Sequence, residues 1–157
     1  MKRFVLILLC LPLLLCCNTR MDPYMGGDGV RVNINGNNYV MFGQVGSKTY
    51  ATAGISQQRR FHLSAPLVSM LYDQERKYTL SIDYLSTSAL KTDIKYDITD
   101  NASLQVADGD KSPLTGWIKF TMIDLNTGKI EACFELSSTQ FSLRHGFLRL
   151  PMNVSTD

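Results

Sequence analysis

The pattern that most constrains this chain is a two-residue alternation of apolar and polar side chains. It is clear near the start, where Val30, Val32 and Ile34 alternate with polar neighbours. Because successive side chains of a strand point to opposite faces, this alternation predicts a half-buried β-strand. The following Asn35-Gly36 tolerates positive φ and predicts a tight hairpin into a second strand at 39–45.

The same alternation recurs to the end of the chain. We predict further strands at 49–55, 59–65, 77–85, 93–98, 103–107, 117–125, 129–136, 141–143 and 146–150. Thr99-Asp100-Asn101 is predicted as a hairpin turn, Arg144-His145-Gly146 as a hinge, and 66–75 as a short helix or irregular crossing. About ten short strands without a long helical period predict an all-β fold. We expect an antiparallel β-sandwich, with a barrel as the alternative.

The clearest hairpin joins 117–125 to 129–136 across Asn126-Thr127-Gly128. Alternation on the second strand divides its side chains between two faces. The apolar set predicted to face the core is Ile130, Ala132, Phe134 and Leu136, and the set predicted to face solvent is Lys129, Glu131, Cys133 and Glu135.

The N-terminus predicts export. Lys2 and Arg3 precede a run at 4–16 that is apolar apart from Pro12. A positive segment followed by such a run is typical of a signal peptide. The run is shorter than the roughly 20 residues that cross a bilayer.

Leu13-Leu14-Leu15-Cys16-Cys17 resembles the lipobox of bacterial lipoproteins. The resemblance implies cleavage before Cys17, acylation of that cysteine with palmitate, and membrane attachment. Cys16 is the alternative acylated residue, but cleavage before it would place bulky Leu15 at the site. Asn18 after the lipid favours the outer membrane. An ordinary secretory signal, cut near 18–21, is the competing interpretation.

These features divide the chain into a signal peptide at 1–16, a lipidated cysteine with a flexible tether at 17–29, and one β-domain at 30–152. Cleavage removes 16 of the 157 residues and leaves 141, a common single-domain size. It also removes two of the 16 basic residues, so 14 basic and 14 acidic residues remain and the net charge falls to zero. No long-range positive field then attracts nucleic acid, which we exclude as a partner.

Several turn and strand motifs resemble small lipobox-bearing lipoproteins of Gram-negative gut anaerobes. They are Asn35-Gly36, the segment Leu114-Thr115-Gly116-Trp117, the hairpin Asn126-Thr127-Gly128-Lys129, and Gly146-Phe147. The chain departs from the family at Tyr39, where members usually have Trp or a similar aromatic residue, and in the residues after Gly146. The resemblance implies an all-β fold and an envelope location. It implies no catalytic residue and no cofactor.

Enzyme signatures are missing from the sequence, which contains no nucleophile elbow, zincin motif or phosphate-binding loop. His62 is predicted to point to solvent and His145 to lie in a turn, and this pair has no zinc-ligand spacing. Cys133 is the one cysteine left after cleavage and lipidation, which rules out a disulfide framework. Glu131 and Glu135 beside it oppose thiolate formation, so we predict no catalytic role.

Three further groups of residues are considered as binding sites. Asp108 and Asp110 suit a calcium-binding loop, but an ordinary turn explains them better. Alternation sends Arg59 and Arg60 to opposite faces of their strand. Trp117 is either one ring of a carbohydrate platform or part of a second core.

We therefore assign no catalytic, cofactor or metal residue. The chain is predicted to be a non-enzymatic envelope lipoprotein that binds a protein or a glycan. Two alternatives stay open: a structural or accessory subunit with no small ligand, and a hydrolase whose carboxylates meet only in the folded chain.

Overall fold

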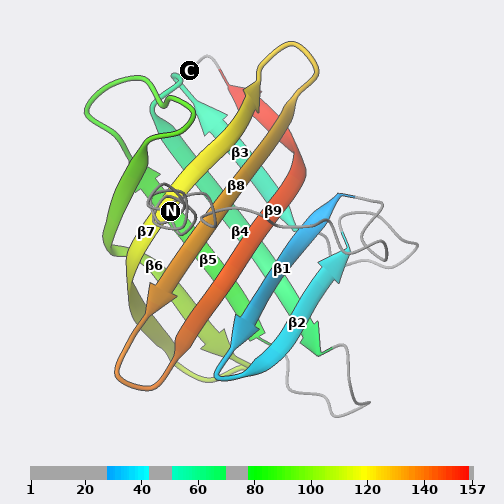
Figure 1. The fold of residues 1–157 in the computed structure, drawn as a ribbon, viewed down its shortest axis with the longest axis vertical. Helices are drawn as coiled ribbons and strands as arrows, with labels where there is room; N and C mark the ends of the chain where they lie inside the picture. The colour runs from blue at the N-terminus through cyan, green and yellow to red at the C-terminus, as the bar shows by residue number, and fades with distance from the viewer. Residues whose placement is uncertain (1–27, 43–50, 70–77, 156–157) are drawn as a thin grey trace, which may run out of the picture.

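The computed structural model describes residues 28–42, 51–69 and 78–155, which form nine strands and no helix (Figure 1). The strands are β1 (Gly29–Ile34), β2 (Asn37–Phe42), β3 (Thr52–Ser56), β4 (Arg60–Ser69), β5 (Tyr78–Leu85), β6 (Lys95–Val106), β7 (Lys111–Asp124), β8 (Lys129–Ser137) and β9 (Ser142–Ser155). The chain is therefore all-β, as predicted.

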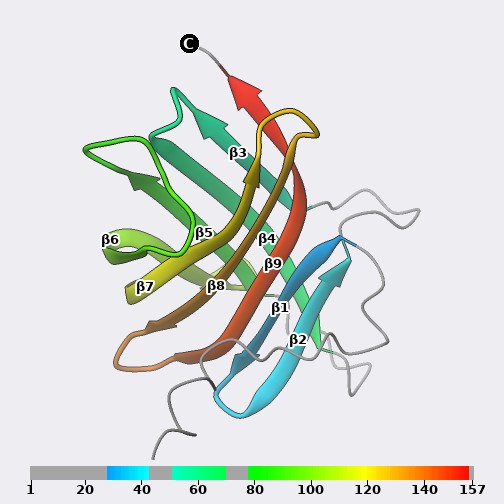
Figure 2. The same cartoon turned by 45° about the horizontal axis from the view of Figure 1, so that its top comes forward.

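The sheet closes into a barrel. Strands β4 to β9 pair antiparallel in chain order, and β3 joins the two ends by pairing antiparallel with β4 and parallel with β9. Seven strands thus form a closed ring, and Figure 2 shows β3, β4 and β5 behind β7, β8 and β9. The expected sandwich is not the arrangement found. Pairing of β4 with β5 links what would have been two separate sheets, and closure leaves few free edges.

The β1–β2 hairpin completes the wall beside β3. β1 pairs with the first part of β9, whereas β3 pairs with its last part. β2 reaches β4 at Tyr39↔Ser69 and Val40↔Val68. The gap between β9 and β4 is thus filled by one strand at one end of the barrel and by a hairpin at the other. Positive φ at Asn35 and Gly36 confirms the predicted tight turn of that hairpin.

Apolar side chains fill the barrel interior. The predicted inner set of β8 is buried, with each side chain at most 2% exposed. Phe61 of β4 and Phe120 of β7 meet across the interior with ring centroids 5.1 Å apart in an edge-to-face arrangement. Burial of this large apolar cluster is the main driving force for the fold.

Two predicted breaks are bulges inside long strands. Thr99-Asp100-Asn101 lies within β6, where the pairing with β7 shifts between Ile98 and Ala102. Arg144-His145-Gly146 lies within β9. Asp100 and His145 have φ of 60° and 53°. The turn and hinge predictions were wrong because neighbouring strands pair on both sides of each irregularity, which absorbs the extra residues.

Several predictions fall wholly or partly outside the described residues. These include the signal peptide, Cys16, Cys17, most of the tether, and residues 43–45, 49–50 and 70–75. Residues 66–69, predicted as part of a crossing, continue strand β4 instead. Within the described part of the chain, no helix is long and apolar enough to cross a membrane.

Candidate functional site

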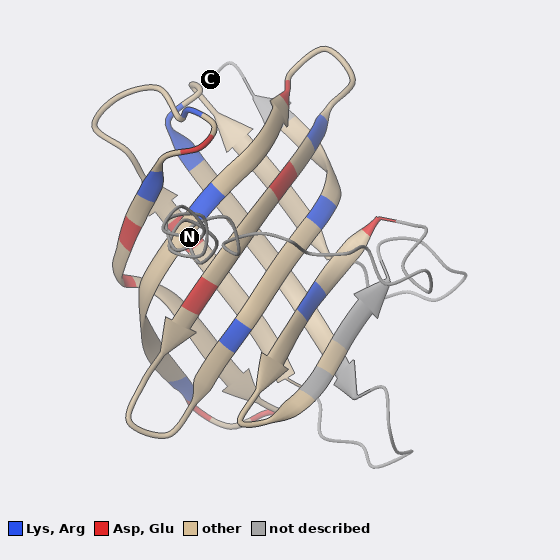
Figure 3. Cartoon of the chain, viewed as in Figure 1, with Lys and Arg blue, Asp and Glu red and all other residues tan. Residues whose placement is uncertain are grey.

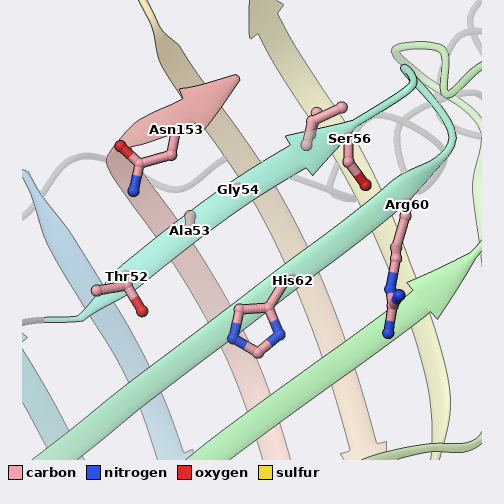
Figure 4. Close-up of a pocket in the computed structure, with 8 residues that line it drawn as sticks. Thr52, Ala53, Gly54, Ser56, Arg60, His62 and Asn153 are labelled. Carbon is pink, nitrogen blue, oxygen red and sulfur yellow. The ribbon is translucent and has the colours of Figure 1, made fainter. Parts of the chain in front are cut away.

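The outer wall is hollowed where β3 lies between β4 and β9. The depression has a volume of about 480 Å³ and is lined by Thr52, Ala53, Gly54, Ile55, Ser56, Arg60, His62 and Asn153. Figure 4 shows His62 and Arg60 projecting from β4 beside Gly54 of β3, with Asn153 on the opposite side. We call this depression the β3 notch.

A single missing side chain explains the notch. The register places Asn153 of β9, Gly54 of β3 and His62 of β4 in one row across the wall. A Cβ atom built on Gly54 would lie 3.3 Å from the Asn153 carbonyl oxygen and meet nothing closer. The row therefore has a polar side chain at each flank and bare backbone between them. Glycine inside a strand often marks such a close approach to backbone.

An ion pair fixes the β4 side of the notch. The Arg60 guanidinium donates two hydrogen bonds to the Asp83 carboxylate, at 2.8 and 2.6 Å. This hydrogen bonding lowers the pKa of Asp83 and raises the pKa of Arg60. His62 is paired in register with Asp83, and its charge also lowers the pKa of that carboxyl. The bidentate geometry limits the directions in which Arg60 can point.

The chemistry of the notch suits a neutral polar ligand. It offers an amide from Asn153, an imidazole from His62, hydroxyls from Thr52 and Ser56, and a guanidinium whose charge Asp83 balances. No group of three or more His, Cys, Asp or Glu side chains among the described residues could hold a metal ion. The notch is therefore equipped to form hydrogen bonds.

The structure brings together Arg60 and His62, but not Arg59 or Trp117. Arg60 and His62 share the notch because they lie two positions apart on β4. Arg59 lies in the β3–β4 turn, where its Nε donates to the Ser86 carbonyl oxygen at 3.2 Å. Sequence analysis missed Gly54 and Asn153. A glycine inside an alternating segment was the available signal for the first.

Trp117 is not part of a second core. The Lys95 ammonium stands 4.0 Å from the centroid of its ring, on the outer wall. The β7–β8 register shifts between Phe120 and Met122, and Ile123 then pairs with the buried Ile130. This bulge reverses the alternation, so Ile123 does not share a face with Trp117.

Cys133 is more buried than predicted, whereas Asp108 and Asp110 lie in the turn region that the sequence predicted. Cys133, predicted on the wet face of β8, is only 6% exposed. Its register neighbours are Lys119 and Phe147, whose large side chains flank it on the outer wall. Asp108 and Asp110 lie in or beside the turn between β6 and β7 and are exposed, and they belong to no metal-binding group found in the described part of the chain.

Comparisons with family models, curated proteins and solved structures find no match to this chain. A function must therefore be argued from the chain's own residues. The β3 notch is the observation on which we base it.

Proposed function

We propose that the protein is an outer-membrane lipoprotein, anchored through acylated Cys17, whose barrel is a non-enzymatic module that binds a glycan or a protein. The charged and apolar segments before Cys17 support the anchor. The β3 notch supports the binding role, and a neutral glycan is the ligand that suits it best.

Three properties of the notch favour a glycan. Its volume of about 480 Å³ lies within the usual range of small-molecule sites, roughly 300 to 1,000 Å³. Asn153, His62 and Asp83 carry donors and acceptors, and sugars supply hydroxyl groups that match both. The Arg60–Asp83 ion pair holds one flank in place, which lowers the entropy cost of binding.

The same residues argue against hydrolysis. A glycosidase needs two carboxyl groups, one of which must be protonated to act as the acid. Asp83 is the carboxylate beside the notch, and hydrogen bonds from Arg60 lower its pKa, so it remains ionised at neutral pH. The residues that line the notch itself include no carboxylate. We therefore propose binding without turnover.

The test is to fill the notch. We would screen the mature chain against neutral oligosaccharides by thermal shift and repeat each positive result with Gly54→Leu. A ligand at 100 times its dissociation constant stabilises the fold by about 2.7 kcal/mol. That shift should disappear in Gly54→Leu and persist in Ser81→Leu, which adds the same side chain to β5, outside the notch. Equal shifts in both variants would rule out the notch as the binding site.

A second candidate is an accessory subunit that contacts another protein through the wall beside the notch. The register places Thr52, Ser64, Ser81 and Ser103 in one outer row across β3 to β6. Small hydroxyl side chains lose little entropy on burial, which favours a flat contact face. Crosslinking through cysteine placed at Ser81 would capture such a partner. A wall that yields no crosslink in envelope preparations would favour the glycan.

The anchor is tested separately by labelling cells with palmitate. Cys17→Ala should abolish incorporation, because that cysteine is the proposed site of lipid attachment. Cys16→Ala should still be labelled. Label that persists in Cys17→Ala but vanishes in Cys16→Ala would make Cys16 the acylated residue.

A further inference from the structure

A second polar pocket lies between the β6 bulge, the first residues of β7 and the loop after β8. It has a volume of about 560 Å³ and is lined by Asp100, Ser112, Pro113, Thr115, Ser137, Ser138, Thr139 and Gln140. Five of these eight residues carry hydroxyl groups. It shares no residue with the β3 notch. We call it the hydroxyl pocket.

One charged residue lines the hydroxyl pocket. Asp100 occupies the left-handed region with φ of 60° inside the β6 bulge, and its side chain is exposed. The bulge places extra residues of β6 opposite Thr115, since Ile98 pairs with Gly116 and Ala102 with Leu114. A bulge commonly re-aims a side chain in this way. Asp100 is therefore the one acidic side chain among the residues that line the pocket.

The hydroxyl groups have capacity left for a ligand. Ser138 Oγ accepts hydrogen bonds from the backbone N–H groups of Gln140 and Phe141, at 3.2 and 3.1 Å, so its own proton is free to donate. Thr115 Oγ1 donates to the Ser137 carbonyl oxygen at 3.4 Å, so its lone pairs are free to accept. These two hydroxyls thus each retain at least one bonding direction for an incoming group.

The loop that presents these groups is already held in place. Ser138 N–H donates to the Phe141 carbonyl oxygen at 2.8 Å. Asn35, from the β1–β2 turn, donates to the Gln140 carbonyl oxygen and accepts from Ser142 N–H, at 3.0 and 2.7 Å. A preformed loop lowers the ordering cost of binding.

We propose that the hydroxyl pocket binds a sugar that carries a free amine, with the ammonium group paired to Asp100 and the sugar hydroxyls bonded to the serine and threonine side chains. A single carboxylate suits one ammonium group. Calcium takes six to eight oxygen ligands, usually including several carboxylates, and this pocket offers only one. The volume, about 560 Å³, also falls in the range of sites for small ligands.

The experiment compares three sugars that differ at one position: glucosamine, N-acetylglucosamine and glucose. Binding to the mature lipoprotein in detergent is measured by calorimetry. We expect glucosamine to bind at least tenfold more tightly than the other two, because only it brings a positive charge to Asp100. Equal affinities for the three sugars, or no binding by any, would overturn the proposal.

Variants connect the preference to the pocket. Asp100→Asn removes the charge and keeps a residue that tolerates positive φ, so the tenfold preference should vanish. Asp100→Gly serves the same purpose if the first variant folds poorly. Asp108→Asn removes a carboxylate outside the pocket and should keep the preference. Gly54→Leu should keep it too, which separates this proposal from the β3 notch. A preference that survives in Asp100→Asn and Asp100→Gly contradicts the assignment.

Discussion

The two sides of the barrel bury similar apolar side chains inside but present different surfaces outside. On one side, Lys119, Cys133, Phe147 and Arg31 form one outer row across β7, β8, β9 and β1. On the other side, the corresponding row is the hydroxyl row that crosses β3 to β6. Figure 3 shows the Lys, Arg, Asp and Glu residues along the strands of the first side. We call the first the charged wall and the second the hydroxyl wall.

The contrast shows how the length of the side chains determines how well they cover the outer surface of a closed sheet. On the charged wall, long side chains cover one another, and even the small Cys133 is only 6% exposed. On the hydroxyl wall, short side chains leave the backbone close to the surface, and one glycine is enough to open the β3 notch. Because the interior already stabilises the barrel, the outer walls can differ without changing the fold.

The largest predicted effect concerns the two glycines, one on each side. A Cβ atom on Gly146 of β9 would lie 2.4 Å from ring carbons of Phe134, whereas one on Gly54 has no contact closer than 3.3 Å. Gly146→Ala should therefore destabilise the fold by about 3 kcal/mol, and Gly54→Ala by less than about 1 kcal/mol. Urea unfolding measures both. Equal losses would show that the barrel interior beside Gly146 packs no more tightly than the outer face at Gly54.

The next effect compares the ion pairs of the two walls. Arg149 and Glu131 are paired on the charged wall with side-chain exposures of 27% and 18%. Arg149→Ala leaves a largely buried carboxylate and should cost about 2 kcal/mol. Arg60 and Asp83 are 56% and 46% exposed, and solvent screens their attraction, so Arg60→Ala should cost much less. A larger loss for Arg60→Ala would reverse the comparison.

The smallest effect is the acid sensitivity of the hydroxyl wall. The pKa of Asp83 is lowered on folding, so the stability from its pairing is present above the unfolded pKa of 3.8 and is lost as pH falls through the lower folded pKa. Asp83→Asn should flatten the loss of melting temperature below about pH 4. Adding Arg60→Gln should change the profile no further. An unchanged profile in Asp83→Asn would show that other carboxyl groups cause the acid loss.

The sequence predicted those features of the fold that depend on residues close together in the chain. The alternation in β8 identified its four inner side chains, and Asn35-Gly36 identified the first turn. Closure was not predictable in this way, because it depends on which distant strands pair. Ile55 and Val154, partners in the parallel β3–β9 pairing, are almost a hundred residues apart in the chain. The turn residues Thr99-Asp100-Asn101 also led to a wrong prediction, because pairing with β7 before and after them makes this segment a bulge within β6.

The two candidate sites likewise combine residues that are close together in the chain with residues that are far apart in it. Spacing of two placed Arg60 and His62 on one face, which alternation predicts. Asn153 reaches them only through the β3–β9 pairing, and Asp100 meets Ser138 only because β7 pairs with both β6 and β8. No local pattern marks such meetings, so the residues that complete both pockets could not be found from the sequence.

The pairing of β9 also determines when the barrel can close during synthesis of the chain. It pairs with β1, β3 and β8, yet it is the last of the nine strands to leave the ribosome. Until then β1 and β3 each keep an unpaired edge, which invites association with other chains. Closure at β9 joins strands from opposite ends of the chain, a slow type of folding step. A newly made chain therefore needs protection along these edges until its last strand is in place.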